Sequence, residues 1–394
     1  MADKSMLSVE AAEKIIASFP VRVRRRTVSL LAARNRILAQ DILAPFPMPE
    51  FNKSAMDGYA YISADRSAAY KIIETIAAGK PPCKKVLPGQ CAKIMTGAML
   101  PPGADRVVKR ECTHEENGFM KVIADDNKLN IRVKGEDLKA GQMVLEKGTL
   151  LRPAQIALLA SLGFVKVATA KPPRIGIITT GTELVEPGTP LQAGQIYNSN
   201  YYSLAAQIRA LGAKPVSLGR VIDNAAVTVK AIVSGLQDCD VLILSGGVSA
   251  GDFDYVPTAM KNAGLTLHVE KISVQPGMPT IFGSRKEKAA FGLPGNPVST
   301  FVIFDVFIKP LIMRLMGHEF QPLTCQAILR NEYCRSQAAR SAFLPIRIDK
   351  GRAIVMDYHG SAHLHALGQA NGLLYIPAGQ NKISAGSMIN VRCL

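Results

Sequence analysis

Three glycine-containing segments carry hydroxyl or carboxylate side chains directly after predicted strands. They read Thr179-Thr-Gly-Thr-Glu183, Ser245-Gly-Gly-Val-Ser249 and Leu293-Pro-Gly-Asn-Pro297. Glycines let backbone amides approach an anion closely, and flanking hydroxyls add hydrogen-bond donors. One glycine-rich turn is often needed only to reverse the chain. Three such turns in one sheet favour the binding of a phosphate or another polar ligand.

Four carboxylates also follow predicted strand ends, namely Glu183, Asp223, Asp252 and Asp254. Oxygen ligands of this kind can hold Mg²⁺ against a phosphate. Aspartate is also favoured as a helix N-cap, so each carboxylate taken singly fits a cap equally well. Their position at a shared edge of the sheet favours a site.

A second group of small and acidic residues lies upstream, around Asp57, Thr96 and Asp137. From spacing alone, both tight β turns and a ligand surface remain open, and turns are the simpler interpretation.

The elements that would position the first group begin after Lys171-Pro-Pro-Arg174. Beyond this boundary, apolar strands alternate with amphipathic helices, as in βαβ units. Predicted strands cover residues 175–180, 215–221, 241–244, 267–274 and 289–293, and predicted helices cover 201–211, 225–236, 255–263 and 298–316. Short, continuous apolar strands predict a parallel, doubly wound sheet that is buried on both faces. Ligands of such sheets gather at the carboxyl ends of the strands.

Other patterns predict the remaining parts of the chain. Ser8 is a predicted N-cap of a helix that ends near Pro20. Three prolines between residues 45 and 49 mark a domain junction. Alternating runs between residues 59 and 133, such as 70–76 and 91–95, predict a small β domain, and residues 153–163 predict a helix. From His318 onward, alternation predicts a C-terminal β domain.

Composition places the chain among ordinary globular proteins with several domains. It has 394 residues, a net charge of +16 and seven cysteines without a CxxC pair. The odd cysteine count argues against a disulfide framework and fits a reducing cytosol. The basic residues favour anionic partners, but they are scattered and lack interleaved aromatics, so nucleic acid is a weak hypothesis. We expect neither an export signal nor a membrane span.

The same segments closely resemble the molybdopterin molybdenumtransferase family, which includes the MoeA-type proteins and the E domain of gephyrin. The resemblance covers nearly the whole chain, with several motifs in the family's order. These motifs are Ser54-Ala-Met-Asp-Gly-Tyr-Ala, Ile94-Met-Thr-Gly-Ala, Gly135-Glu-Asp, Thr180-Gly-Thr-Glu-Leu, Ser245-Gly-Gly-Val-Ser, Gln275-Pro-Gly-Met-Pro and Gly292-Leu-Pro-Gly-Asn-Pro-Val-Ser.

The resemblance implies an α/β multidomain fold and an elongated homodimer. Residues 1–46 and 139–170 would form a discontinuous, elongated domain I, and residues 47–138 an inserted β domain II. Residues 171–317 would form the molybdopterin-binding α/β domain III, and residues 318–394 a C-terminal β barrel, domain IV. The active cleft would lie between subunits, with Asp57, Thr96 and Asp137 of one subunit facing the α/β domain of the other.

The resemblance also implies an activity. The substrates would be adenylylated molybdopterin and molybdate, and the reaction would release AMP in the presence of Mg²⁺, as the last step of molybdenum cofactor biosynthesis. Glu183, Asp223 and Asp254 would hold the metal, and Lys271 would supply positive charge. The cofactor pocket would contain Thr180, Gly181, Ser245, Gly246, Gly247, Val248, Ser249, Gln275, Pro276, Gly277, Pro294, Gly295, Asn296 and Pro297.

Two alternatives stay open at this point, namely adenylyl transfer to molybdopterin and a non-catalytic, gephyrin-like scaffold. We further expect a cytoplasmic protein that contacts molybdopterin adenylyltransferase and molybdoenzyme maturation proteins.

This chain departs from the family pattern in two places. Gln275 and Met278 stand where many relatives have lysines, and a neutral amide supplies hydrogen bonds without charge. His363 and His365 replace part of a serine-containing segment near the C-terminus. These histidines could be metal ligands on one strand face, but two histidines without a third ligand are more often surface residues.

Overall fold

A computed structural model describes residues 6–124, 127–222, 224–248, 255–356 and 363–394. The chain divides into two compact units. Unit 1 contains Met1–Ala39, Gly148–Arg152 and Lys166–Leu394, and unit 2 contains Gln40–Lys147 and Pro153–Val165. The glycine-rich segments therefore belong to unit 1, whereas Asp57, Thr96 and Asp137 belong to unit 2.

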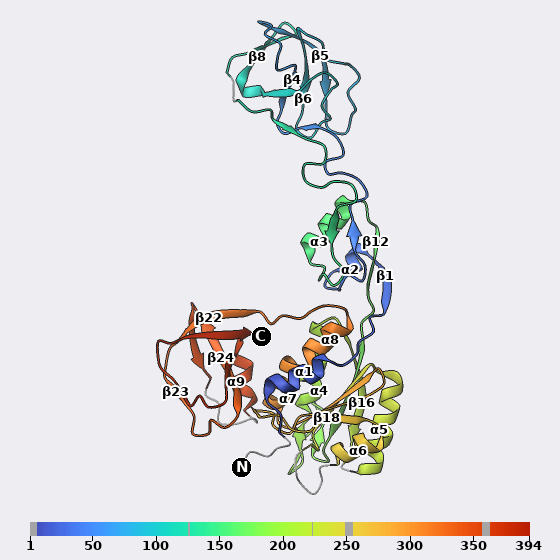
Figure 1. Ribbon diagram of the computed structural model, residues 1–394, viewed down its shortest axis with the longest axis vertical. Coiled ribbons are helices and arrows are strands. Elements are labelled where there is room, and N and C mark those ends of the chain that lie inside the picture. The colour runs from blue at the N-terminus through green and yellow to red at the C-terminus, as the bar shows by residue number, and fades with distance from the viewer. Residues whose placement is uncertain (1–5, 125–126, 223, 249–254, 357–362) are drawn as a thin grey trace. The chain divides into compact units, whose positions relative to one another are not determined.

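A six-stranded sheet forms the centre of the α/β part of unit 1 (Figure 1). In spatial order its strands are β16 (Lys214–Val221), β13 (Arg174–Thr180), β17 (Val241–Ser245), β21 (Lys288–Leu293), β20 (Ile281–Arg285) and β18 (Thr266–Val269). The first four strands are parallel, and β20 pairs antiparallel with both β21 and β18. The predicted doubly wound sheet is confirmed, with four parallel strands. Strand β20 was not predicted, and it makes that edge of the sheet antiparallel.

Helices cover both faces of this sheet (Figure 1). On one face lie α1 (Val9–Ala17), α4 (Ser199–Ala210) and α7 (Pro297–Ile303), and on the other lie α5 (Ala225–Asp238) and α6 (Val256–Asn262). Successive strand residues point to opposite faces, so Ile177 joins the first core and Ile178 the second. Burial on both faces explains why the strands are continuously apolar.

The predicted N-terminal helix is confirmed as α1. Ser8 is its N-cap, and the Ala11 amide donates to the Ser8 hydroxyl at 3.1 Å. This bond satisfies one of the amides that have no partner within the helix.

The predicted helix at residues 298–316 contains a change of helical type. The α-helical turns of α7 pass into a π-helical segment, η2 (Phe304–Ile308), and then into α8 (Lys309–Leu315). Pro310 stands near the start of α8 and has no backbone N–H to donate within the helix. π-Helix is rare, and where it occurs it is mostly a single turn inside an α-helix, as here.

The prediction of one strand over residues 267–274 is wrong. Strand β18 ends at Val269, and β19 (Val274–Gln275) pairs instead with a strand of the C-terminal region. Between them the chain turns to Leu7, whose amide donates to the Lys271 carbonyl and whose carbonyl accepts from the Ser273 amide. These bonds to the N-terminal segment replace those of a continuous strand.

Unit 2 contains the predicted small β domain. Its sheet has the order β7-β4-β6-β5-β9-β8, with β4 (Gly58–Tyr61), β5 (Tyr70–Ile76), β6 (Gln90–Ile94), β7 (Arg106–Lys109), β8 (Thr113–Glu116) and β9 (Phe119–Val122). Shorter elements are β2 (Ile42–Leu43), β3 (Lys53–Ser54), η1 (Arg110–Cys112), β10 (Ile131–Arg132), β11 (Met143–Leu145) and α3 (Pro153–Ser161). The strands predicted at 70–76 and 91–95 and the helix at 153–163 are therefore present.

The C-terminal region of unit 1 forms a closed barrel of five strands. These are β22 (Thr324–Leu329), β24 (Ser341–Asp349), β25 (Arg352–Val355), β26 (Gly372–Ile376) and β28 (Met388–Cys393), and β28 closes the ring against β22. Accompanying elements are β23 (Tyr333–Cys334), β27 (Lys382–Ile383) and α9 (Leu364–Gln369). An antiparallel ribbon of β1 (Arg25–Ser29) and β12 (Lys166–Ala170), with the short helix α2 (Leu30–Ala33), also belongs to unit 1.

Among the residues that the structure describes, we find no helix with both the length and the apolar character needed to cross a membrane.

Candidate functional site

The carboxyl ends of β13, β17 and β21 meet at one edge of the sheet. Thr179 lies beside Ser245, and Ser245 lies beside Leu293 in the strand register. The three glycine-containing segments that follow these strands are therefore neighbours, as their pattern predicted.

The turn after β17 depends on glycine. Gly246 has φ +102°, and a Cβ atom there would lie 2.6 Å from the Thr180 hydroxyl oxygen and 2.7 Å from the Thr180 carbonyl oxygen. Its amide donates to the Leu293 carbonyl at 2.9 Å. Gly247 also has a positive φ, of +66°. The Val248 side chain is buried, and it fills the space that a Cβ atom at Gly292 would need. These residues hold the turn close to both neighbouring strands, whereas Ser249 lies outside the described residues.

The turn after β13 brings a carboxylate back toward the backbone. Gly181 has φ +143°, and a Cβ atom there would lie 2.6 Å from both carboxylate oxygens of Glu183. The carboxylate therefore occupies the space beside the backbone that a side chain at this position would take, and the positive φ itself favours glycine. The next strands, β14 (Leu184–Val185) and β15 (Ile196–Tyr197), pair in parallel, and the Ile196 amide donates to the Glu183 carbonyl. The Glu183 backbone is thus held at the edge of the sheet, and its side chain is exposed there.

Asn200, in the first turn of α4, joins two of the loops. Its side-chain nitrogen donates to the Ser245 hydroxyl at 2.8 Å and to the Gly295 carbonyl at 2.7 Å. Its side-chain oxygen is buried and has no hydrogen-bond partner among the described residues. An unpartnered buried acceptor is costly, so the amide orientation follows from the two acceptors that require its nitrogen.

Asn198 fixes the start of the same helix. Its side-chain oxygen accepts from the Tyr201 amide, which makes it the N-cap of α4. Its side-chain nitrogen donates to the Thr179 hydroxyl and to the Glu186 carboxylate, each at 3.1 Å. The N-terminus of α4 is therefore tied to the end of β13.

These elements enclose a cavity of about 480 Å³. Its walls are Thr179, Thr180, Glu183, Leu184, Ile196, Tyr197, Asn198, Ser199, Asn200, Ser245, Gly295, Asn296, Pro297 and Leu364. Six of the residues predicted from the sequence are in this wall, namely Thr180, Glu183, Ser245, Gly295, Asn296 and Pro297. Hydroxyl, amide and carboxylate groups lie in this wall beside apolar side chains, a combination that suits a ligand with both an apolar and a phosphate-bearing part.

Sequence reasoning missed the wall residues Ile196, Tyr197, Asn198, Ser199, Asn200 and Leu364. Asn198 and Asn200 carry a signal that was available, because asparagine is a favoured residue at helix starts and both flank the start of α4. Leu364 carries none, because it opens α9 in the C-terminal region and reaches the cavity only through the packing of α9 against α7.

The Gln275 segment is placed by the C-terminal region. Gln275 lies in β19 and stands opposite Ala342 of β24. Gly277 has φ +113°, and a Cβ atom there would lie 2.5 Å from the Ile303 side chain of α7. A guanidinium nitrogen of Arg340 lies 3.5 Å from the Met278 sulfur. Positive charge is thus present beside Met278, although it comes from a different segment.

The other predicted residues of unit 1 are placed as follows. The Thr300 hydroxyl donates to the Pro294 carbonyl at 2.6 Å, and this hydrogen bond fixes the turn before α7. Pro276 follows Gln275, and the Lys271 carbonyl accepts from Leu7. Asp223, Asp252 and Asp254 lie outside the described residues.

Within the described part of the chain, no group of three or more histidine, cysteine or acidic side chains is arranged to hold a metal ion.

In unit 2 the structure brings Asp57 and Thr96 together. The Thr96 amide and hydroxyl both donate to one Asp57 carboxylate oxygen, at 2.6 and 2.7 Å. The amide, and then the hydroxyl, hold the pKa of Asp57 below its usual value. Asp137 follows the turn at Gly135 and donates its amide to the Met48 carbonyl. Both acids are exposed on unit 2.

The histidine hypothesis is wrong about the secondary structure. His363 is the N-cap residue of α9 and His365 lies within that helix, so they do not share a strand face. Residues two apart on a helix point in different directions. His365 contacts Gln369 one turn later, with 2.9 Å between their side-chain nitrogens.

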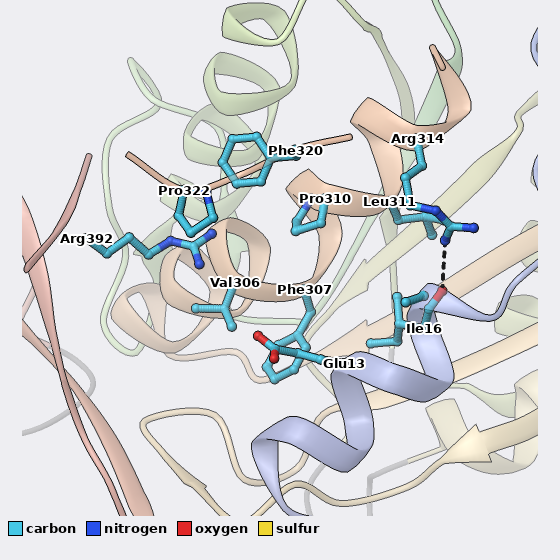
Figure 2. A pocket seen from close by; sticks show the side chains of 11 residues that line it. Glu13, Ile16, Val306, Phe307, Pro310, Leu311, Arg314, Phe320, Pro322 and Arg392 are labelled. Carbon is cyan, nitrogen blue, oxygen red and sulfur yellow. Dashed lines mark hydrogen bonds between the residues drawn. The ribbon is translucent and has the colours of Figure 1, made fainter. Parts of the chain in front are cut away.

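A second cavity of about 320 Å³ lies against α1, α8 and β28, and Figure 2 shows its lining. Arg314 donates to the carbonyls of Ile16 and Phe19, at 3.3 and 3.0 Å, and so caps the end of α1. Arg392 donates to Asp305. Because both guanidinium groups are engaged within the protein, this cavity offers mainly apolar surface.

The fold and the cavity together define the class of protein. This is a multidomain α/β protein with a polar cavity at the carboxyl edge of a doubly wound sheet and a closed C-terminal barrel. Three family models match successive parts of it: the MoeA N-terminal region (domain I and II) at residues 7–163, a probable molybdopterin binding domain at 176–314, and the MoeA C-terminal region (domain IV) at 328–394.

Relatives match over almost the full length. A molybdopterin molybdenumtransferase of Bacillus subtilis is 32% identical over 98% of this chain and 94% of its own, and molybdopterin molybdenumtransferase 2 of Mycobacterium tuberculosis is 35% identical over 98% and 99%. A crystal structure of the molybdopterin biosynthesis MoeA protein from Pyrococcus horikoshii has a TM-score of 0.85 and 30% identity, covering 98% of this chain and 99% of that one. The chain belongs to the molybdopterin molybdenumtransferase family.

Proposed function

We propose that this chain inserts molybdenum into adenylylated molybdopterin with release of AMP, as the last step of molybdenum cofactor biosynthesis. The observation that carries the proposal is the polar cavity shared by the turns after β13, β17 and β21. Its hydroxyl and amide groups suit the phosphate and pterin parts of such a substrate. The names of the relatives support the same role.

The protein groups in the cavity suit positional and electrostatic catalysis. The Ser245 hydroxyl oxygen accepts from Asn200, so its own hydrogen is available to a ligand oxygen in the cavity. Asn200 also fixes Gly295, which keeps the two loops at a set spacing around the ligand. Nothing in this arrangement requires a covalent intermediate with the protein.

We propose that Mg²⁺ binds here through Glu183, with Asp223 and Asp254 as further ligands. The support is that Glu183 is exposed and lines the cavity, and that Mg²⁺ prefers carboxylate oxygens as ligands. When bound, the ion would neutralise phosphate charge and polarise the phosphoanhydride. Lys271 is our proposed additional source of positive charge.

We further propose a homodimer in which a second copy supplies Asp57, Thr96 and Asp137 to the cavity of the first. The division into domains I to IV at the predicted boundaries is part of the same proposal. Mixing the Asp57→Asn and Glu183→Gln variants tests it, because each mixed dimer would contain one intact site. Recovery of activity on mixing supports the shared site, and no recovery despite demonstrated subunit exchange contradicts it.

The decisive experiment measures AMP release from adenylylated molybdopterin, with molybdate and Mg²⁺ present or withheld. We expect release only when both are added. Consumption of ATP with accumulation of adenylylated product from unmodified molybdopterin would identify the chain as an adenylyltransferase instead. Folded protein without either activity would favour a scaffold role. A cytoplasmic location and contacts with the adenylyltransferase and with molybdoenzyme maturation proteins complete the proposal.

A further inference from the structure

Two thiols lie together at one end of the C-terminal barrel. Cys325 is on β22 and Cys393 is on β28, and their sulfur atoms are 3.5 Å apart. Cys325 stands opposite Val391 in the antiparallel register, so both cysteines lie on the same face as Val391. That face is the barrel interior, because Val391 is fully buried and Cys325 packs against the same apolar core.

We propose that Cys325 and Cys393 form a reversible oxidation site that closes to an intramolecular disulfide. The sulfur separation in a disulfide is about 2.05 Å, so the two atoms must approach by roughly 1.5 Å. The two residues are diagonal neighbours across the strand pair, so this approach combines side-chain rotation with a small backbone adjustment. The Cys393 amide donates to the Leu323 carbonyl at 2.8 Å, which holds the two strands together at this point.

The oxidation is a thiol–disulfide exchange with a small disulfide such as oxidised glutathione. One cysteine thiolate attacks the small disulfide, forms a mixed disulfide and releases one thiolate. The second cysteine, as thiolate, then attacks the protein sulfur of that mixed disulfide and releases the other. Two protein thiols become one disulfide, and one small disulfide becomes two small thiols. Because the second sulfur already lies beside the first, the second step is intramolecular.

Accessibility separates this pair from the two buried cysteines. Both sulfur-bearing residues are partly exposed, whereas Cys91 and Cys239 are buried. Burial, followed by the hydrogen bond to Cys325, raises the pKa of the Cys393 thiol. A raised pKa lowers the fraction of reactive thiolate, so the proposal rests on the proximity of the two sulfur atoms.

The bond would connect the first and last strands of the barrel. It would lie next to Arg392, which bonds Asp305 of the π-helical segment. A cross-link over such a long loop restricts the unfolded chain strongly. Oxidation would thus lock the barrel closed without touching the polar cavity.

The test treats the full chain with oxidised glutathione, blocks remaining thiols with an alkylating reagent, and maps the peptides by mass spectrometry. We expect the Cys325 and Cys393 peptides to be linked and to separate on reduction. Exposed Cys83 and Cys334 serve as internal controls and should carry glutathione instead. A Cys83→Ser, Cys334→Ser double variant should still form the link, with a mass loss of two hydrogen atoms.

Two results would overturn the proposal. One is alkylation of both Cys325 and Cys393 after treatment, while Cys83 and Cys334 carry glutathione. The other is a lasting glutathione adduct on Cys325 or Cys393 of the unaltered chain, which would show that the second thiol does not resolve it. The Cys325→Ser variant should give the adduct on Cys393 alone, which provides the reference for that second result.

Discussion

Asp305, within the π-helical segment η2, accepts a 2.5 Å hydrogen bond from Arg392, which lies 87 positions later on the last strand of the barrel. Lys309 donates to the other carboxylate oxygen at 2.7 Å. The Asp305 side chain is only 6% exposed and that of Arg392 14%. A buried carboxylate therefore joins the helix that follows the polar cavity to the C-terminal barrel.

Breaking this pair should destabilise the protein. Arg392→Met keeps much of the side-chain volume but leaves Asp305 with Lys309 alone, so we expect the free energy of unfolding to fall by roughly 2–4 kcal/mol. Urea unfolding followed by circular dichroism measures the change. The control is Lys382→Met at the exposed pair with Glu332, which should have no measurable effect because solvent screens that pair. Equal losses in both variants would contradict the assigned role of Asp305.

Gly246→Ala should damage the cavity as well as the fold. The added Cβ would collide with Thr180, and the positive φ alone costs about 1 kcal/mol for alanine. Gly194→Ala is the matched control, because Gly194 also has a positive φ but open space around it. Calorimetry with AMP should show lost binding for Gly246→Ala and unchanged binding for Gly194→Ala. Normal binding by a folded Gly246→Ala variant would argue that the turn does not shape the ligand site.

Asn200→Ala should weaken ligand binding by roughly tenfold or more, because two hydrogen bonds of about 1 kcal/mol each hold the loops that carry Ser245 and Gly295. Asn200→Asp should weaken ligand binding further, since a carboxylate would face the Gly295 carbonyl. Gln207→Ala, on the same helix α4, should behave as the unaltered chain. AMP titration with a thermal unfolding control separates loss of the site from loss of the fold. Tight AMP binding by Asn200→Asp would refute the arrangement.

The Asp57–Thr96 contact should make unit 2 sensitive to acid. Thr96 lowers the pKa of Asp57 below its usual 3.8, so the ionised carboxylate stabilises the folded state near neutral pH. That contribution is lost as the pH falls through the lowered pKa. NMR titration of labelled aspartate should give a pKa for Asp57 below 3.8. Thr96→Val should raise it only in part, because the amide remains, and a value at or above 3.8 in the unaltered chain would disprove the contact.

The α/β sheet, and the edge of it that carries the cavity, could be predicted from the sequence. Strands that are buried on both faces appear as continuous apolar runs. Ile177 and Ile178 face opposite cores, and such apolar runs separated by glycine turns indicate parallel strands. The Ser8 cap was equally predictable, since its signal is local.

The remaining strands and wall residues could not be predicted, because their positions depend on contacts that a local sequence pattern does not reveal. Strand β20 was missed because it meets β21 through a tight turn at Lys286 and Glu287, which lacks the usual glycine or asparagine. Strand β19 was merged with β18 because its partner, β24, lies far along the chain. Leu364 reaches the cavity for the same reason, through packing between distant segments.

The order of barrel pairing has a consequence for how the protein is made. Strand β28 pairs with both β22 and β26, so the ring cannot close until residues 388–393 have left the ribosome. The parallel strands β13, β17 and β21 are complete well before then. The α/β sheet can therefore assemble during synthesis, whereas the barrel, and with it the Arg392 bond to Asp305, must form as a late step of maturation.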